Sequence, residues 1–526
     1  MENQDRPLHF FNTAGPCNQA DHYMLPPEER LIGAQLERYV SGKLYWVLHA
    51  PRQTGKTTFL LDWMRQINQK GEAMAFYVTV EVCQGVDDVD EAMVLCSSCV
   101  RDAFARAKLP NPMPKKGSSE TVLEDTLNNA ATIVAPKPLV ILFDEVDVLT
   151  GQPLIRFLRV LRGGYATRGP GVFPVSIALV GMRDLKDYIT AAKDGVPPNP
   201  GSPFNIKEDS VTLGNFTQEN IAHLFAQRTE ETEQVITQEA LDYVWEQSRG
   251  QPWIVNNLFK RATLRVLNER DFQTVTLEHL EAARKQMIEA RETHLDSLEY
   301  RLNDDAVRRV IQSIVSGSSA EPLNTNSRDV QYCLDLGLIR FDSNKGFIIS
   351  NPVYEEEFIR FLDDKYRTAA PPPSSWRWQK EDGSLDMDAL LKEFQKFWRR
   401  HSDIWEEKED YTEVFPHLLL LGFMQRVING EGKIERESAA GSGRMDIMID
   451  YKGAISIIEI KLIHSHDSPA TVKEEGLEQI QRYRDKFDAK APSYLLIFDR
   501  RPSAKKLSWD ERISWKEEDG ITVLGC

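Results

Sequence analysis

The chain has 526 residues, of which 41% are hydrophobic and 27% are charged, and its net charge is −16. Compact domains usually hold ~100–200 residues, so this length predicts three or four units of ordinary globular composition. The negative charge excludes a protein that coats nucleic acid by charge alone, although a local basic groove remains compatible with it. The longest apolar runs fall far short of the ~20 residues that span a bilayer, and six scattered cysteines fit a reducing compartment. We therefore expect a cytoplasmic, multidomain protein without membrane contact.

Short apolar runs alternate with helical patterns in the first part of the chain. We expect strands at 44–49, 73–82, 139–143, 174–180 and 210–213, and helices at 57–69, 90–108 and 120–134. The run 139–143 is apolar at every position, which is typical of a strand buried on both faces. Strands that alternate with helices predict a parallel α/β sheet. From 217 to 292 the pattern is helical only.

A phosphate-binding loop is predicted between the first strand and the helix that follows it. The run APRQTGKT from Ala50 to Thr57 matches G-x-x-x-x-G-K-[ST] except at its first position, where alanine replaces glycine. In such loops the backbone N–H groups converge on phosphates, the lysine contacts the β- and γ-phosphates, and the hydroxyl reaches Mg²⁺. The positive end of the helix dipole adds to the attraction. The pattern predicts that ATP and Mg²⁺ are bound by Ala50, Pro51, Arg52, Gln53, Thr54, Gly55, Lys56, Thr57 and Thr58.

A carboxylate partner for this loop follows the buried run 139–143. Asp144 is expected to hold Mg²⁺ together with Thr57, directly or through water. Glu145 is expected to polarise the attacking water as a general base. The presence of Glu145 therefore favours ATP hydrolysis over simple nucleotide storage.

Five runs resemble the archaeal-type and STAND-related branch of the AAA-like ATPases, and the resemblance covers about residues 20–360. They are Tyr23–Arg30, Ala50–Thr58, Gly181–Asp184, Gly250–Trp253 and Asn351–Tyr354. The resemblance implies that Arg183 lies near the γ-phosphate as a sensor and that Pro252 packs near the adenine from a helical lid. It also implies an ATP-dependent homo-oligomer, because related ATPases complete their sites with a neighbour's arginine. The sequence leaves that arginine open among Arg159, Arg162 and Arg168.

The pattern changes after residue 300. A helix at 304–315, a second helix ending near 336, and strands at 338–340 and 346–349 give the element order of a winged helix. The proline-rich run AAPPPSS that follows at 369–375 predicts a stiff linker.

Beyond the linker, two expected strands bring acidic residues and a lysine together. Asp446 ends the run GRMD, and Glu459 and Lys461 alternate within IIEIK, so these two share one face while Ile458 and Ile460 face the core. Two carboxylates and a backbone carbonyl, here that of Ile460, can hold Mg²⁺ or Mn²⁺. A lysine beside them can position a water and stabilise charge on a phosphate.

These residues resemble the PD-(D/E)xK nuclease superfamily over about residues 385–526. The run Gly443–Asp446 fits the G-x-x-D of its RecB-type branch, and Gln479–Tyr483 on the following helix fits Q-x-x-x-Y. The resemblance implies a restriction-endonuclease-like α/β domain that cleaves nucleic acid, DNA above all, with contacts to it from Gln479, Arg482 and Tyr483. It also implies a further acidic metal ligand at Glu413, with Glu435 and Glu437 as alternatives.

The sequence thus predicts that the chain has five parts. They are a P-loop ATPase core at 1–215, a helical lid at 216–295, a winged helix at 296–366, a linker at 367–384 and a nuclease-like domain at 385–526. The leading hypothesis is an ATP-regulated nuclease that acts on foreign or mobile DNA. One alternative is a signalling switch whose C-terminal domain binds a partner without cutting, and the intact Asp446, Glu459 and Lys461 disfavour it. The other is a DNA-remodelling ATPase, which the non-basic recognition helix at 327–336 disfavours.

Overall fold

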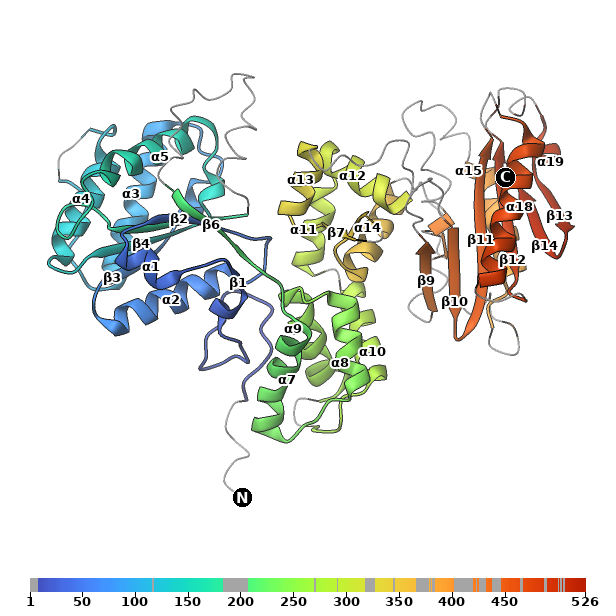
Figure 1. Ribbon diagram of the computed structural model, residues 1–526, viewed down its shortest axis with the longest axis horizontal. Helices are drawn as coiled ribbons and strands as arrows, with labels where there is room; N and C mark the ends of the chain where they lie inside the picture. Colours follow the sequence, from blue (N-terminus) through green and yellow to red (C-terminus); the bar gives the residue numbers. More distant parts are fainter. Residues whose placement is uncertain are drawn as a thin grey trace. The chain divides into compact units, whose positions relative to one another are not determined.

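The computed structural model of the chain (Figure 1) is described here in two compact units. One extends to Arg284 and includes Asp335–Gly337; the other runs from Lys285 to Cys526 without those three residues. The described residues are 8–115, 118–182, 207–268, 271–290, 292–316, 327–343, 346–365, 378, 380, 384–401, 420–421, 423–424, 432–437, 446–463, 467–486, 490–499, 501, 504 and 507–526. Among them, no helix is both long and apolar enough to cross a membrane.

A six-stranded sheet in the order β1-β6-β2-β5-β4-β3 forms the centre of the first unit. Its strands are β1 (Leu31–Ile32), β2 (Tyr45–His49), β3 (Met74–Thr79), β4 (Leu139–Asp144), β5 (Ser176–Gly181) and β6 (Lys207–Leu213). All neighbours are parallel except β1 and β6. The carboxyl ends of β2, β5 and β4 therefore lie side by side at one edge, which is where open α/β sheets bind ligands.

Helices cover both faces of this sheet (Figure 1). They are α1 (Leu36–Ser41) and α2 (Lys56–Lys70) on one face, and α3 (Val89–Arg106), α4 (Val122–Val134) and α5 (Gly151–Tyr165) on the other. Alternate residues of β4 enter the two cores, since Ile141 and Phe143 pack towards α3–α5 while Val140 and Leu142 pack towards α2. This explains why the run is apolar throughout. The expected strand at 73–82 is too long, because Glu81–Cys83 forms a 3-10 turn.

The stretch expected to be helical forms a helical layer that follows β6. Its helices are α7 (Gln218–Thr232), α8 (Gln238–Ser248), α9 (Pro252–Arg261), which continues into a π-helical turn at Ala262–Val266, and α10 (Leu277–Glu289). Proline at the first position of α9 leaves no N–H without a partner there, and the Gln251 side chain accepts from the N–H of Ile254 at 2.7 Å. The prediction of an exclusively helical region is confirmed.

The second unit begins with helices and a small sheet in the order expected for a winged helix. They are α11 (Thr293–Arg301), α12 (Asp305–Ser316), α13 (Arg328–Asp335), the antiparallel strands β7 (Ile339–Asp342) and β8 (Gly346–Ile349), and α14 (Pro352–Lys365). The sequence did not predict α11 and α14. Asn351 caps α14 by accepting from the N–H of Tyr354 at 2.9 Å, and the Tyr354 hydroxyl lies 2.8 Å from His294 Nε2 of α11.

A second six-stranded sheet, in the order β13-β14-β12-β11-β10-β9, forms the C-terminal domain. Its strands are β9 (Gly432–Glu437), β10 (Asp446–Tyr451), β11 (Ala454–Ile463), β12 (Ser493–Asp499), β13 (Ser514–Glu518) and β14 (Ile521–Gly525). Strands β11, β12 and β14 are parallel, and the remaining neighbours are antiparallel. The two strands expected around Asp446 and within IIEIK are confirmed as β10 and β11.

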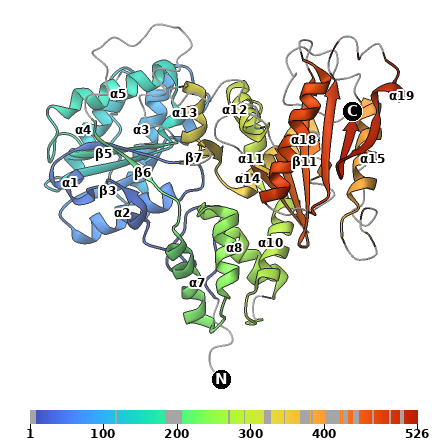
Figure 2. The same cartoon turned by 45° about the vertical axis from the view of Figure 1, so that its right-hand side comes forward.

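Two helices pack on opposite faces of this sheet. Helix α18 (Pro469–Lys486) packs on β11 and β12, and Figure 2 shows it beside β11; its Ile480 packs with Leu495. On the other face, Trp398 of α15 (Met387–His401) stacks edge-on against Phe498 with ring centroids 4.8 Å apart. A short helix, α19 (Trp509–Arg512), precedes β13.

Candidate functional sites

The loop after β2 has the backbone geometry of a phosphate-binding loop. Gly55 has φ +95° and caps α2, which begins at Lys56, and Gln53 also has a positive φ of 56°. These left-handed residues turn the chain sharply before the helix, so that successive N–H groups can point into one hollow. Ala50 is not among the described residues with positive φ, so alanine fits this position without backbone strain.

The lysine of the loop is buried and held by the loop itself. Lys56 Nζ donates to the carbonyl oxygens of Ala50 at 2.8 Å and Pro51 at 3.0 Å. Burial lowers the pKa of Lys56, whereas the carboxylates of Glu145, Asp144 and Asp147 act to raise it. A buried ammonium that faces several carboxylates is suited to binding a polyphosphate that brings further negative charge.

The predicted metal pair is in direct contact. Thr57 Oγ1 donates to Asp144 Oδ2 at 2.7 Å, and the Tyr77 hydroxyl donates to the same oxygen at 3.0 Å. Glu145 follows in the left-handed region with φ 58°, and its N–H donates to Asp144 Oδ1 at 3.0 Å. Burial raises the pKa of Glu145, and the nearby Asp147 and Asp144 carboxylates raise it further. A carboxylate whose pKa is raised is a better proton acceptor at neutral pH.

Asp147 is a site residue that sequence reasoning missed. It lies in the 3-10 turn Val146–Val148, and its buried Oδ1 has no hydrogen-bond partner within the described ranges of the chain. The site is close to the end of β5, since a Cβ on Gly181 would lie 3.0 Å from Asp147 Oδ1. The run DEVD was visible in the sequence, but nothing in it says that the fourth residue turns back towards β5. Arg183, the expected sensor, lies outside the described residues.

The segment 8–24 lies against the helical layer and reaches the P-loop helix. Trp253 Nε1 donates to the carbonyl of Thr13 at 3.1 Å, and Lys260 Nζ donates to Thr13 Oγ1 at 2.9 Å. At the other end, the N–H of Cys17 donates to Thr58 Oγ1 at 3.0 Å. Pro252 is buried at the start of α9, beside Trp253. The structure thus brings the expected lid residues and the end of the P-loop to one segment, which the sequence did not single out.

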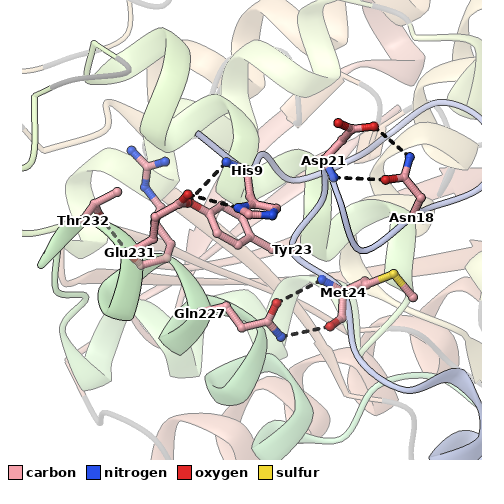
Figure 3. Close-up of polar contacts among 9 residues, drawn as sticks. His9, Asn18, Asp21, Tyr23, Met24, Gln227, Glu231 and Thr232 are labelled. Atoms are coloured by element: carbon pink, nitrogen blue, oxygen red, sulfur yellow. Dashed lines mark hydrogen bonds and ion pairs between the residues drawn. The ribbon is translucent and has the colours of Figure 1, made fainter. Parts of the chain in front are cut away.

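Side chains of α7 hold the same segment further along, as Figure 3 shows. The Tyr23 hydroxyl donates to Glu231 Oε2 at 2.6 Å, and His9 Nδ1 lies 3.0 Å from Glu231 Oε1. Gln227 exchanges two hydrogen bonds with the backbone of Met24, at 3.1 and 3.0 Å. Together these contacts fix residues 9–24 on the helical layer.

The three arginines considered for a neighbour's site differ in their surroundings. Arg168 is engaged within its own chain, since it donates to the carbonyl oxygens of Lys43 at 2.6 Å and Tyr165 at 2.5 Å. Arg159 and Arg162 lie exposed on α5. Because they are exposed, Arg159 and Arg162 stay candidates for a contact with another molecule.

In the C-terminal domain, Glu459 and Lys461 form a buried ion pair on β11. Lys461 Nζ lies 2.6 Å from Glu459 Oε1, and the two side chains are 0% exposed. The lysine also donates to Gln479 Oε1 of α18, which places Gln479 in the site. Gly476 lets α18 approach this closely, because a Cβ there would lie 2.6 Å from Leu495 Cδ1 and 3.2 Å from Lys461 Cγ. The predicted common face of Glu459 and Lys461 is thus the face covered by α18.

The strand register brings three acidic positions to one row across the sheet. Asp446 pairs with Glu437 of β9, and the next residue, Ile447, pairs with Ile458 of β11. One further step along that register sets Asp446 opposite Glu459. Glu437 therefore shares the row of Asp446 and Glu459. Glu435 pairs instead with Met448, and Glu413 lies outside the described residues.

The Glu459 carboxylate fits a bound cation. Apart from the Lys461 ion pair, neither of its buried oxygens has a hydrogen-bond partner among the residues that the structure describes. A buried carboxylate in this state is costly unless a cation shares it. Within the described parts of the chain, no group of three or more His, Cys, Asp or Glu side chains is already arranged around a common point. A metal bound here would therefore need further ligands besides Glu459, such as the Asp446 carboxylate.

The remaining residues expected to contact nucleic acid lie on α18. Arg482 is exposed, and its Nε donates to the carbonyl of Glu478 at 3.4 Å within the helix. Tyr483 is half-buried one helical turn after Gln479.

The strand order, the P-loop geometry and the Thr57–Asp144 contact define the first unit as a P-loop ATPase fold. The C-terminal region matches the family model of the PD-(D/E)XK nuclease superfamily over residues 412–497. No curated protein matches the chain. The chain therefore carries a P-loop ATPase fold in its first unit, followed by a region that matches the PD-(D/E)XK nuclease superfamily over residues 412–497.

Several solved structures are similar to the part of the chain that precedes the nuclease domain. The Walker-type ATPase PABY2304 of Pyrococcus abyssi is 13% identical with a TM-score of 0.46, and the match covers 66% of this chain and 99% of that one. Cdc6p from Pyrobaculum aerophilum is 15% identical with a TM-score of 0.37 and coverage of 63% and 93%. The RuvB Holliday junction branch migration motor of Thermotoga maritima is 13% identical with a TM-score of 0.33 and coverage of 62% and 95%. Because these values are low, the fold assignment rests on the strand order and the loop.

Proposed function

We propose that this chain is an ATP-hydrolysing enzyme whose C-terminal domain is a Mg²⁺-dependent nuclease that cuts DNA. The observation that carries the proposal is the buried Glu459–Lys461 pair on β11, in register with Asp446, inside the region that matches a nuclease superfamily. An ion pair that only stabilised the fold would not need a second acidic residue, Asp446, opposite Glu459 on the neighbouring strand. It would also not need the Gln479 amide of α18 to orient Lys461. The target within a cell, foreign or mobile DNA, stays a prediction.

In the ATPase site, each residue has a separate task. Lys56 places its charge on the β- and γ-phosphates, and the N–H groups of the loop cradle them. Thr57 and Asp144 hold Mg²⁺, which neutralises phosphate charge when it is bound. Glu145 takes a proton from the attacking water, and its raised pKa suits this role. Pro252 packs near the adenine at the start of α9.

In the nuclease site, Asp446 and Glu459 hold Mg²⁺ or Mn²⁺, with the Ile460 carbonyl as a further ligand and Glu437 close by in the same row. The metal supplies the charge that activates water and neutralises the scissile phosphate. Lys461, held by Gln479, keeps a fixed positive charge beside that phosphate. The exposed Arg482 lies on the same helix and is placed to contact the DNA backbone.

Cleavage of labelled nucleic acid by the full chain tests this proposal. Double-stranded DNA, single-stranded DNA and RNA are each incubated with Mg²⁺, Mn²⁺ or EDTA, with and without ATP. We expect metal-dependent cleavage of DNA by the wild type and none by Glu459→Ala. The exposed Glu474 of α18 provides a matched control, and Glu474→Ala should cut like the wild type. No cleavage under any condition would favour the signalling switch, and preference for RNA would correct the substrate.

A further inference from the structure

Arg30 lies directly behind the P-loop, where sequence reasoning assigned no residue. It ends the 3-10 turn Pro27–Arg30 just before β1, and its side chain is buried. Its Nη2 donates to the carbonyl of Thr54 at 2.9 Å, and its Nη1 donates to the carbonyl of Gly214, just after β6, at 3.0 Å. One guanidinium thus ties the P-loop to the end of a neighbouring strand.

The bond to Thr54 fixes the direction of the next N–H group. In a trans peptide, the carbonyl and the following N–H point in opposite directions. Since the Thr54 carbonyl points back to Arg30, the Gly55 N–H points away from Arg30, towards the phosphate side of the loop. Glycine is needed at this position, because a Cβ on Gly55 would lie 2.9 Å from Arg30 Nη2. Arg30 therefore lies on one side of Gly55, and the phosphates are expected on the other side.

The same guanidinium is connected through Phe216 to the start of the lid helix α9. Its Cζ lies 4.8 Å from the ring centroid of Phe216, whose N–H donates to the carbonyl of Gly250 at 2.8 Å. Gly250 has φ +76°, and a Cβ there would lie 1.9 Å from the Phe216 carbonyl oxygen, so only glycine allows this contact. Gly250 is followed by Gln251, the cap of α9, and by Pro252. Contacts therefore run without a break from Thr54 through Arg30 and Phe216 to the turn before α9.

The charge of Arg30 has no carboxylate partner among the described residues. Its Nε is buried without a hydrogen-bond partner, and its other contacts are two carbonyl oxygens and an aromatic face. Burial lowers the pKa of Arg30 to about 10. A buried cation without an anion is unfavourable until an anion approaches. The phosphates expected on the far side of Gly55 would supply such an anion.

We propose that Arg30 is a positioning residue for ATP turnover that couples phosphate binding in the P-loop to the position of the lid helix α9. The proposal rests on the proposed ATPase function and adds a connection between the P-loop and the lid helix α9. Phosphate binding stabilises the guanidinium in place, the guanidinium holds Phe216, and Phe216 holds the turn at Gly250. The adenine contact at Pro252 thereby becomes dependent on an occupied P-loop.

The test combines steady-state kinetics with hydrogen–deuterium exchange on the full chain. The variants are Arg30→Lys, Arg30→Met and Phe216→Leu, and the control is Arg38→Met, an exposed arginine of α1. In the wild type and the control, ATP should slow exchange in both the P-loop and α9. For Arg30→Met we expect a KM for ATP raised at least tenfold and no ATP-dependent protection of α9 at saturating ATP. Arg30→Lys should recover part of the KM effect, since it restores the charge but not the fork of donors.

Phe216→Leu separates coupling from loop geometry and remains informative if Arg30→Met does not fold. It keeps the bond from Arg30 to Thr54, so its KM should rise less than that of Arg30→Met while protection of α9 is lost. A wild-type KM in Arg30→Met, or retained protection of α9 in Phe216→Leu, would overturn the proposal. A wild type that neither binds nor hydrolyses ATP would instead contradict the proposed function, and this inference with it.

Discussion

Lys56 is the residue on which the nucleotide site depends most directly. Its ammonium is buried at the carboxyl edge of the first sheet and faces three carboxylates. We predict that Lys56→Ala abolishes ATP hydrolysis and weakens ATP binding, because the charge on the β- and γ-phosphates is lost. The measurement is phosphate release and ATP affinity, with Lys70→Ala at the exposed end of the same helix as control. Unchanged turnover in Lys56→Ala would contradict the P-loop assignment.

A substitution of Glu145 tests ATP hydrolysis separately from ATP binding. We predict that Glu145→Gln preserves ATP affinity while turnover falls by ~10²-fold or more, since the general base is lost and its size is kept. Turnover and equilibrium binding measured on the same preparation decide between the two effects. If Glu145→Gln binds no ATP, Glu145 supports the loop or the metal and does not act as the base.

The Glu459–Lys461 pair predicts a stability effect that an exposed pair would not produce. Lys461→Ala leaves a buried carboxylate without its cation, so we expect the free energy of unfolding of the second unit to fall by ~3–5 kcal/mol without metal. The double variant Glu459→Ala/Lys461→Ala should be less destabilised than Lys461→Ala alone. Urea unfolding of the four members of this cycle is the measurement. A double variant whose loss equals the sum of the two single losses would mean that the pair is not coupled.

At the scale of residues, the sequence predicted the site residues that belong to a motif of known spacing. It missed the site residues that lie on other segments of the chain. Lys56, Thr57 and Asp144 follow strands that the apolar pattern already located. Tyr77 and Arg30 lie on separate segments and reach the site only through the fold. No local pattern could have assigned either of them.

At the scale of elements, strand prediction worked for the buried apolar run of β4 and failed for three strands of the second sheet, β9, β13 and β14. Strand β4 is apolar from Leu139 to Phe143 because both faces are covered. Strands β9, with the sequence GKIERE, and β13, with SWKEE, form the two edges of the second sheet. Charged residues are common on edge strands, because they discourage pairing with other molecules, and they hide the apolar alternation that would reveal a strand.

The attachment of residues 9–24 to α7 gives a prediction at this scale. Tyr23→Phe removes the hydrogen bond to Glu231, and we expect the first unit to lose about 1–2 kcal/mol of unfolding free energy at neutral pH. Burial acts to raise the pKa of Glu231, but Tyr23 and His9 together lower it. Its stabilisation is therefore present above the ordinary value of 4.5 and is lost as pH falls below it.

Thermal unfolding between pH 4 and pH 7 measures this effect, with the exposed Tyr300→Phe as control. The difference between wild type and Tyr23→Phe should narrow towards the acid end of the range. A difference that stays constant with pH would mean that the tyrosine acts through packing alone.

At the scale of the whole molecule, the ATPase site is expected to be completed by a neighbour. We predict self-association in the presence of a non-hydrolysable ATP analogue, detected by light scattering. Arg159→Ala or Arg162→Ala should then lower turnover without loss of ATP binding, whereas the internally bound Arg168 should matter for stability. A chain that stays monomeric with the analogue, or full turnover in both arginine variants, would contradict the oligomeric site.

The central claim is that one chain holds two separable active sites, and parallel assays of three proteins test it most directly. Wild type, Lys56→Ala and Glu459→Ala are each assayed for ATP turnover and for Mg²⁺-dependent cleavage of DNA. The account predicts that Glu459→Ala loses cleavage while its ATP turnover stays within about twofold of the wild type, because its metal ligand lies in another domain. Lys56→Ala should lose ATP turnover, and any change in its cleavage then measures the coupling. Cleavage that survives Glu459→Ala would place the nuclease site elsewhere and contradict the account.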